Sequence, residues 1–109
     1  MTEYIIIITT SNSKSNAKLI ATSLVEKKLA ACVQIIPEIK STFKWKNSIN
    51  EEKEILLLIK TTRILENDIK NKIKEVHNYE TPEIISFPFN ILTDDYKKWF
   101  NLSIGEKLE

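Results

Sequence analysis

The stretch ACVQIIPEIKSTFKWKNSINEEKEILLLI, residues 31–59, predicts a long β-hairpin. Its first strand runs from Ala31 to Trp45 and ends in an alternation of aromatic residues and lysines. Pro37 interrupts this strand and marks a bulge or bend, because proline has no backbone N–H to donate. The segment NSIN from Asn47 predicts the tight turn, since asparagine tolerates positive φ, and the apolar run Ile55–Ile59 returns as an inner strand.

The segments on either side of the hairpin predict two more strands and three helices. Residues 4–10 include four successive isoleucines, which show no alternation and favour a strand buried on both faces. Before the hairpin we expect a strand at 4–10 and a helix that is capped from the cluster Ser11, Asn12 and Ser13 and runs to the lysine pair Lys27 and Lys28. After the hairpin we expect a helix capped by Thr62 and ending around His77 and Asn78, a strand at 83–87, and a helix capped by Thr93. This order predicts a single α+β domain over residues 1–109. Its plan is the ferredoxin-like βαββαβ arrangement, an antiparallel sheet with helices on one face, followed by a C-terminal helix.

The composition is that of a soluble globular protein without a strong charge bias. The 109 residues carry 16 basic and 15 acidic side chains, so neither nucleic acid nor membrane lipid is an expected partner. No segment approaches the ~20 apolar residues of a membrane span and no signal peptide is evident, so we expect a cytoplasmic protein. One glycine, Gly105, leaves no phosphate-binding glycine loop, and one cysteine leaves no intrachain disulfide.

His77 and Cys32 are the nitrogen and sulfur candidates for metal binding. His77 is the sole histidine, and imidazole is a common metal ligand and proton shuttle. A surface histidine at a helix C-terminus is the ordinary alternative, since no second histidine is present to complete a site. Cys32 lies in the apolar segment AACVQII, where packing as a small hydrophobe is the ordinary interpretation and a ligating thiolate the alternative.

Tyr79, Glu80 and Glu83 place a phenol and two carboxylates within five positions on one turn. This spacing suits acid–base chemistry or the binding of a hard cation, although exposed glutamates are more often simply solvated. Lys60 ends an apolar strand, where it can bind an anion or extend its amine to water.

Phe43 and Trp45 project from the far part of the long hairpin. Large apolar groups in that position favour a contact between subunits, with packing inside the monomer as the alternative.

Four segments in order, KLAACVQIIPEIKSTFKWKNSINEE, EILLLIKTT, HNYETPEIISFP and DYKKWF, resemble the CutA family of divalent-cation tolerance proteins. The resemblance covers nearly the whole chain. It implies a homotrimer in which the hairpin extends beyond its own domain and strands pair across subunits. It also implies intersubunit clefts, in a family linked to copper and other divalent cations, close to Cys32, Lys60, His77, Tyr79 and Glu80.

The chain departs from the family pattern at three positions. Many relatives carry glycine where this chain has Glu38 and Asn47, and proline where it has Asn78. The first two replacements suggest altered turn geometry or different backbone angles, and asparagine is the most tolerated replacement for glycine at positive φ.

Our hypothesis from the sequence is a non-catalytic homotrimer that binds Cu²⁺ or another divalent cation at its subunit interfaces. In it Cys32 is the soft ligand, His77 the nitrogen ligand, Glu80 and Glu83 the oxygen ligands, and Lys60 an anion anchor. One alternative is a signalling trimer similar to the PII proteins, which bind small anions between subunits, and another is a trimeric scaffold for partner proteins. An enzyme is disfavoured, because no combination of nucleophile, base and orienting group is evident.

Overall fold

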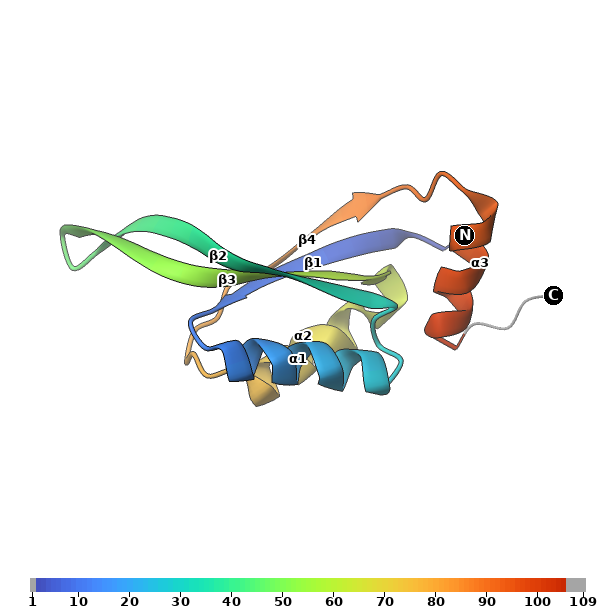
Figure 1. The fold of residues 1–109 in the computed structure, drawn as a ribbon, viewed down its shortest axis with the longest axis horizontal. Helices are drawn as coiled ribbons and strands as arrows, with labels where there is room; N and C mark the ends of the chain where they lie inside the picture. The colour runs from blue at the N-terminus through green and yellow to red at the C-terminus, as the bar shows by residue number, and fades with distance from the viewer. Residues whose placement is uncertain (1, 106–109) are drawn as a thin grey trace.

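The computed structural model describes residues 2–105 and contains a four-stranded antiparallel sheet in the order β2-β3-β1-β4 (Figure 1). In chain order the elements are β1 (Tyr4–Ser11), α1 (Lys14–Glu26), β2 (Cys32–Trp45), β3 (Ser48–Thr62), the 3-10 turn η1 (Arg63–Leu65), α2 (Glu66–Val76), β4 (Ile84–Phe89) and α3 (Asp94–Ser103). The predicted ferredoxin-like α+β plan, with its long hairpin and C-terminal helix, is confirmed.

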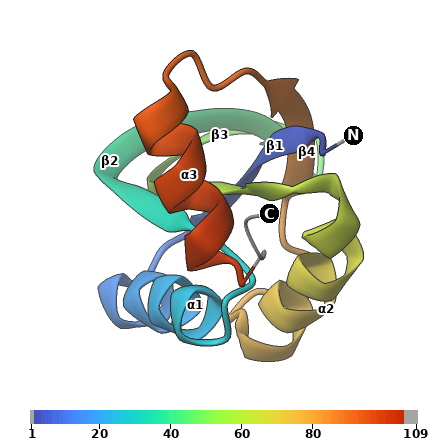
Figure 2. The ribbon, with the colours of Figure 1, turned by 90° about the vertical axis from the view of Figure 1, so that its right-hand side faces the viewer.

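Helices α1 and α2 cover one face of the sheet and enclose the core (Figures 1 and 2). Ile5 and Ile7 of β1 and Leu57 and Ile59 of β3 point to this face and are at most 1% exposed. The helices contribute residues that are equally buried, namely Ala17, Ile20, Leu24, Ile69 and Ile73. Alternate residues of the two central strands therefore form the core.

The opposite face of the sheet is covered by α3 at one end and is open over the rest. Phe100 of α3 is fully buried, with its ring 5.3 Å from that of Tyr4, and the Tyr4 hydroxyl donates to Oδ1 of Asn101 at 2.9 Å. Beyond α3 this face carries half-buried or exposed apolar residues, which we call the open face: Ile6, Ile8, Ile36, Leu56, Leu58, Ile85 and Phe87. The prediction that β1 is buried on both faces is therefore wrong for the single subunit, because α3 is too short to cover this face.

The hairpin of β2 and β3 extends beyond the rest of the sheet, so the subunit measures 55 × 25 × 22 Å (Figure 1). Its turn consists of Lys46 and Asn47, with φ of 49° and 66°, the left-handed conformation that a two-residue hairpin turn requires. Residues 48–50, which the sequence placed in the turn, belong to β3, because two residues at positive φ complete the reversal. The predicted bulge at Pro37 is confirmed by a shift in the β2–β3 register, and Glu38 within it keeps a negative φ.

Two of the predicted helix caps differ from the structure. Ser13 caps α1 as expected, since its Oγ accepts the backbone N–H of Asn16 at 3.2 Å. Thr62 does not cap α2, because it still belongs to β3 and the 3-10 turn η1 separates it from the helix. Thr93 occupies the N-cap position of α3 but makes no capping hydrogen bond through its side chain. Each helix within residues 2–105 is too short or too polar to cross a membrane.

Replacing Leu57 by alanine tests the assignment of the core. Leu57 is fully buried on a central strand, so Leu57→Ala should lower the free energy of unfolding by about 2–5 kcal/mol. The control Ile64→Ala removes a side chain that is 84% exposed. It should change the free energy of unfolding by less than about 0.5 kcal/mol. Urea denaturation followed by circular dichroism, at one protein concentration, measures both values, and equal values would contradict the assignment.

Candidate functional site

His77 ends α2 and ties the α2–β4 loop to β1. Its Nε2 lies 2.7 Å from the carbonyl oxygen of Thr10, and the backbone N–H of Tyr79 donates to its Nδ1 at 2.9 Å. Because a carbonyl only accepts and a backbone N–H only donates, these two hydrogen bonds fit the tautomer with its proton on Nε2. Both ring nitrogens are thus engaged within the subunit, and a metal ion would have to replace one of these hydrogen bonds.

Asn78 also ties the α2–β4 loop to the end of β1 and the residue after it. Its Oδ1 accepts from the Ser11 hydroxyl at 3.2 Å, and its Nδ2 donates to Oδ1 of Asn12 at 2.8 Å. The side chain of Asn16 adds a bond from its Nδ2 to the carbonyl of Val76, also at 2.8 Å. Proline at position 78 could make neither side-chain bond, so this departure from the family pattern adds contacts between the α2–β4 loop and the end of β1.

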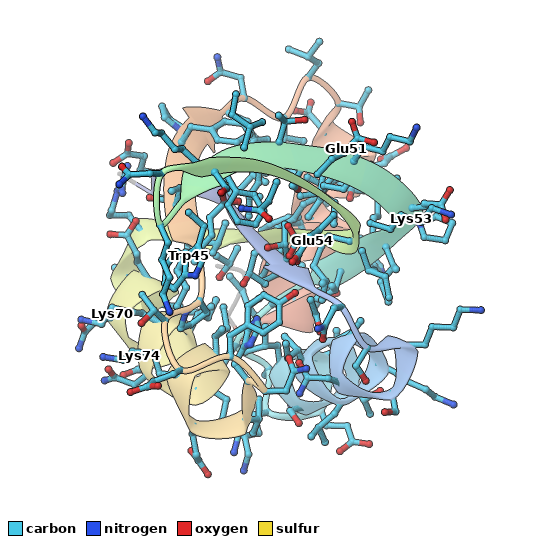
Figure 3. The ribbon with its side chains drawn as sticks, turned by 90° about the vertical axis from the view of Figure 1, so that its left-hand side faces the viewer. Trp45, Glu51, Lys53, Glu54, Lys70 and Lys74 are labelled. Carbon is cyan, nitrogen blue, oxygen red and sulfur yellow. The ribbon has the colours of Figure 1, made fainter. Side chains whose placement is uncertain are left out.

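A groove of about 540 Å³ lies between the hairpin and the α2–β4 loop, and we call it the acidic groove. Its charged side chains are Glu52 and Glu54 of β3 and Glu83, which precedes β4. The other lining residues are Thr10, Ser41, Thr42, Phe43, Tyr79 and Thr81. Figure 3 looks along the hairpin from its tip and shows Glu54 near the middle of the molecule, whereas Glu51 and Lys53 point outward. The structure therefore brings two predicted site residues, Tyr79 and Glu83, into one groove.

Tyr79 links this loop to β3. Its hydroxyl donates to Oε2 of Glu54 at 2.8 Å. Burial, followed by this hydrogen bond and the negative charges of Glu54 and Glu52, raises the pKa of the phenol above its ordinary value of 10.0. Neither glutamate is among the site residues predicted from the sequence, although their spacing of two along a strand places both on one face. Their presence makes the groove acidic.

Cys32 and Lys60 lie opposite each other on β2 and β3, toward the other end of the sheet. Lys60 pairs with Ile6 of β1, four residues before Thr10, where His77 binds, and this corresponds to about 13 Å along the strand. Within residues 2–105, no three His, Cys, Asp or Glu side chains lie close enough together to hold a metal ion. A single subunit therefore does not bring Cys32 to His77.

The remaining predicted residues lie apart from this groove or at its rim. Glu80 is exposed and lines a second groove, between α2 and β4. Phe43 is 39% exposed and lines the acidic groove, whereas Trp45 is 63% exposed next to the hairpin turn (Figure 3). Trp45 is therefore not packed inside its own subunit, and its role in a subunit contact stays a prediction.

Comparisons with known proteins agree on one family. The family model described as CutA1 divalent ion tolerance protein matches residues 5–103. The divalent-cation tolerance protein CutA of Thermus thermophilus is 36% identical over 92% of this chain and 97% of that protein. Human protein CutA is 41% identical over 84% of this chain and 51% of the human protein. The crystal structure of CutA1 from Ehrlichia chaffeensis is 31% identical, covers 96% of this chain and 98% of that one, and has a TM-score of 0.89.

The relatives differ in length and in named location. This chain spans about half the length of the human and Arabidopsis thaliana proteins. The Arabidopsis protein is named as chloroplastic, and a similar structure from Archaeoglobus fulgidus is described as periplasmic.

The raised pKa of Tyr79 predicts a pH dependence that Tyr79→Phe should remove. The folded state holds the phenol neutral, so its contribution to stability is complete below about pH 10 and is lost as the pH rises above this value. The free energy of unfolding of the wild type should exceed that of Tyr79→Phe by about 1–2 kcal/mol near neutral pH. Denaturant titrations at increasing pH measure this difference. If it stayed constant well above about pH 10, the phenol would not be held by Glu54.

Proposed function

The chain belongs to the CutA1 divalent ion tolerance protein family, and on this premise we propose that it is a homotrimer that binds divalent cations between its subunits. In this proposal it supports metal tolerance without catalytic turnover. The observation that carries the proposal is that the acidic groove and the open face lie on the same side of the sheet. Contacts that cover the open face would therefore reach the groove.

The open face supports the assembly. Ile36, Ile85 and Phe87 are 39%, 53% and 41% exposed, and contiguous exposed apolar residues on this scale are typical of protein interfaces. β2 and β4 form the two edges of the sheet, and an edge strand carries backbone groups that can pair with a strand of another subunit. Pairing across subunits, together with the exposed Trp45 at the end of the hairpin, accounts for a subunit that extends so far from its own core.

The donor atoms of the acidic groove fit a hard divalent cation. Carboxylate, carbonyl and water oxygens are the ligands preferred by ions such as Mg²⁺, Ca²⁺ and Mn²⁺. Glu83 and Glu52 are the proposed ligands within one subunit, while Glu54 accepts the hydrogen bond from Tyr79. Further oxygen ligands would come from water or from the neighbouring subunit, because these carboxylates alone do not form a close set.

Copper requires a different set of residues. Cu²⁺ prefers nitrogen ligands and Cu⁺ prefers sulfur, so His77 and Cys32 remain the proposed ligands. They can meet only if Cys32 of one subunit approaches His77 of another, and His77 must then give up one of its two hydrogen bonds. Glu80, on the far side of the loop, would join such a site only across an interface. A cytoplasmic location stays part of the proposal.

The trimer predicts a particle of three times the 12.7 kDa subunit at micromolar concentration. Ile85→Lys places a charge on the open face and should shift the protein toward monomer, because burying an unpaired ammonium is costly. Leu19→Lys is the matched control, since Leu19 is 49% exposed on α1, on the other side of the sheet. Multi-angle light scattering measures the mass, and a monomeric wild type would exclude the assembly.

Calorimetric titrations test the cation site. Glu83→Gln should weaken Mn²⁺ or Ca²⁺ binding about fivefold or more, because the site loses a charged ligand. Glu26→Gln at the end of α1 removes the same charge away from the groove and should leave binding unchanged. For copper, equal affinities of the wild type and His77→Ala would remove His77 from the ligand set. If none of these ions bound the wild type, the proposed function would be wrong.

A further inference from the structure

The groove between α2 and the edge strand β4 is distinct from the acidic groove. Its volume is about 600 Å³, within the range of about 300–1,000 Å³ that is typical of small-molecule sites. Pro82 and Ile84 supply apolar surface above the buried Ile7 of β1, and α2 forms the opposite wall. The groove therefore combines an apolar surface with a polar helical wall.

Two lysines of the α2 wall form no ion pair within residues 2–105. Lys70 and Lys74 lie one helical turn apart, both are exposed, and Figure 3 shows both extending from α2 in the same direction. Within residues 2–105, neither makes an ion pair, whereas Lys72 between them binds Glu75 at 3.3 Å. The two groove lysines thus present an uncompensated positive charge beside the apolar surface.

The carboxylates of the same groove, Glu66 and Glu80, form no ion pair with Lys70 or Lys74 among the described residues. Glu66 is held at the opposite end by Arg63, at 2.6 Å, and by a hydrogen bond from the Ser86 hydroxyl. Glu80 is the remaining acidic residue of the lining, and it lies on the loop rather than on the helix. The helical wall is therefore positive along the two turns that carry Lys70 and Lys74.

We propose that this groove binds a small organic anion that carries an aliphatic chain. The anionic head, a carboxylate or a phosphate monoester, binds Lys70 and Lys74, and the chain lies on Pro82 and Ile84. Two ammonium groups favour a ligand that carries negative charge. The apolar surface favours a ligand that also carries hydrocarbon, which a simple inorganic ion lacks. The site needs no metal and goes beyond the proposed cation site.

Octanoate and hexyl phosphate are suitable probes for the full chain in its native assembly, with a chelator present to remove metals. Binding followed by the isoleucine methyl signals in NMR spectra should perturb Ile7 and Ile84, which line the helix-facing side of the sheet. Between butanoate and octanoate the affinity should rise about two- to threefold for each added methylene, somewhat less than the about fourfold expected for full burial. A preference for octanoate or for hexyl phosphate identifies which head the groove accepts.

The lysines provide the matched variants. Lys70→Gln and Lys74→Gln should each weaken octanoate binding about three- to tenfold, and the double variant more. Lys72→Gln, which removes the paired lysine between them, should leave the affinity unchanged. The proposal is overturned if Lys72→Gln weakens binding as much as the other two, if acetate binds as tightly as octanoate, or if the perturbed signals lie on the open face instead.

Discussion

The alternation of side chains along β3 is the constraint on which the rest of the molecule depends. Its odd-numbered residues from Ile55 to Thr61 point toward the helices and are buried. Its even-numbered residues point the other way, with Leu56 and Leu58 on the open face and Glu52 and Glu54 in the acidic groove. A slip of one residue would exchange the two sets and place carboxylates against the core. One strand thus determines the core, the open face and the groove together.

The sequence predicted the parts of the fold that periodicity specifies. The hairpin, the order of elements and the bulge at Pro37 follow from β-strand and helix patterns and from the missing N–H of proline. The isoleucines of β1 carry no alternation, so the sequence could not show that one face packs on helices and the other is open. Thr62 satisfied the rule for a helix cap, but pairing with Tyr4 keeps it in the sheet. The errors therefore arose where tertiary pairing overrides a local signal.

The candidate site was predicted only in part, because the partners of its residues are remote in the sequence. His77 and Tyr79 were singled out by type, but the carbonyl of Thr10 carries no signal in the sequence, and Glu54 lies 25 positions from Tyr79. The acidic run in the hairpin resembled an ordinary solvated strand. Lys70 and Lys74 likewise match the water-facing side of a helix, and only the position of β4 places them beside an apolar groove.

Under the proposed function, the distribution of donor atoms makes assembly decide which cation the protein prefers. Within one subunit, the oxygen donors gather in the acidic groove, the thiol lies toward the other end of the sheet, and the imidazole is held by two hydrogen bonds. In the proposed function the subunit alone would thus supply only some of the ligands of a hard cation, and water or a neighbouring subunit would supply the rest. A softer ion gains ligands only when an interface brings Cys32 to His77. The free energy of its binding must then exceed the loss of the His77 hydrogen bond that helps to hold the α2–β4 loop. Because Tyr79 extends from that loop to Glu54, binding at His77 would also disturb the acidic groove. The two kinds of cation would therefore compete through one loop even though their ligands differ.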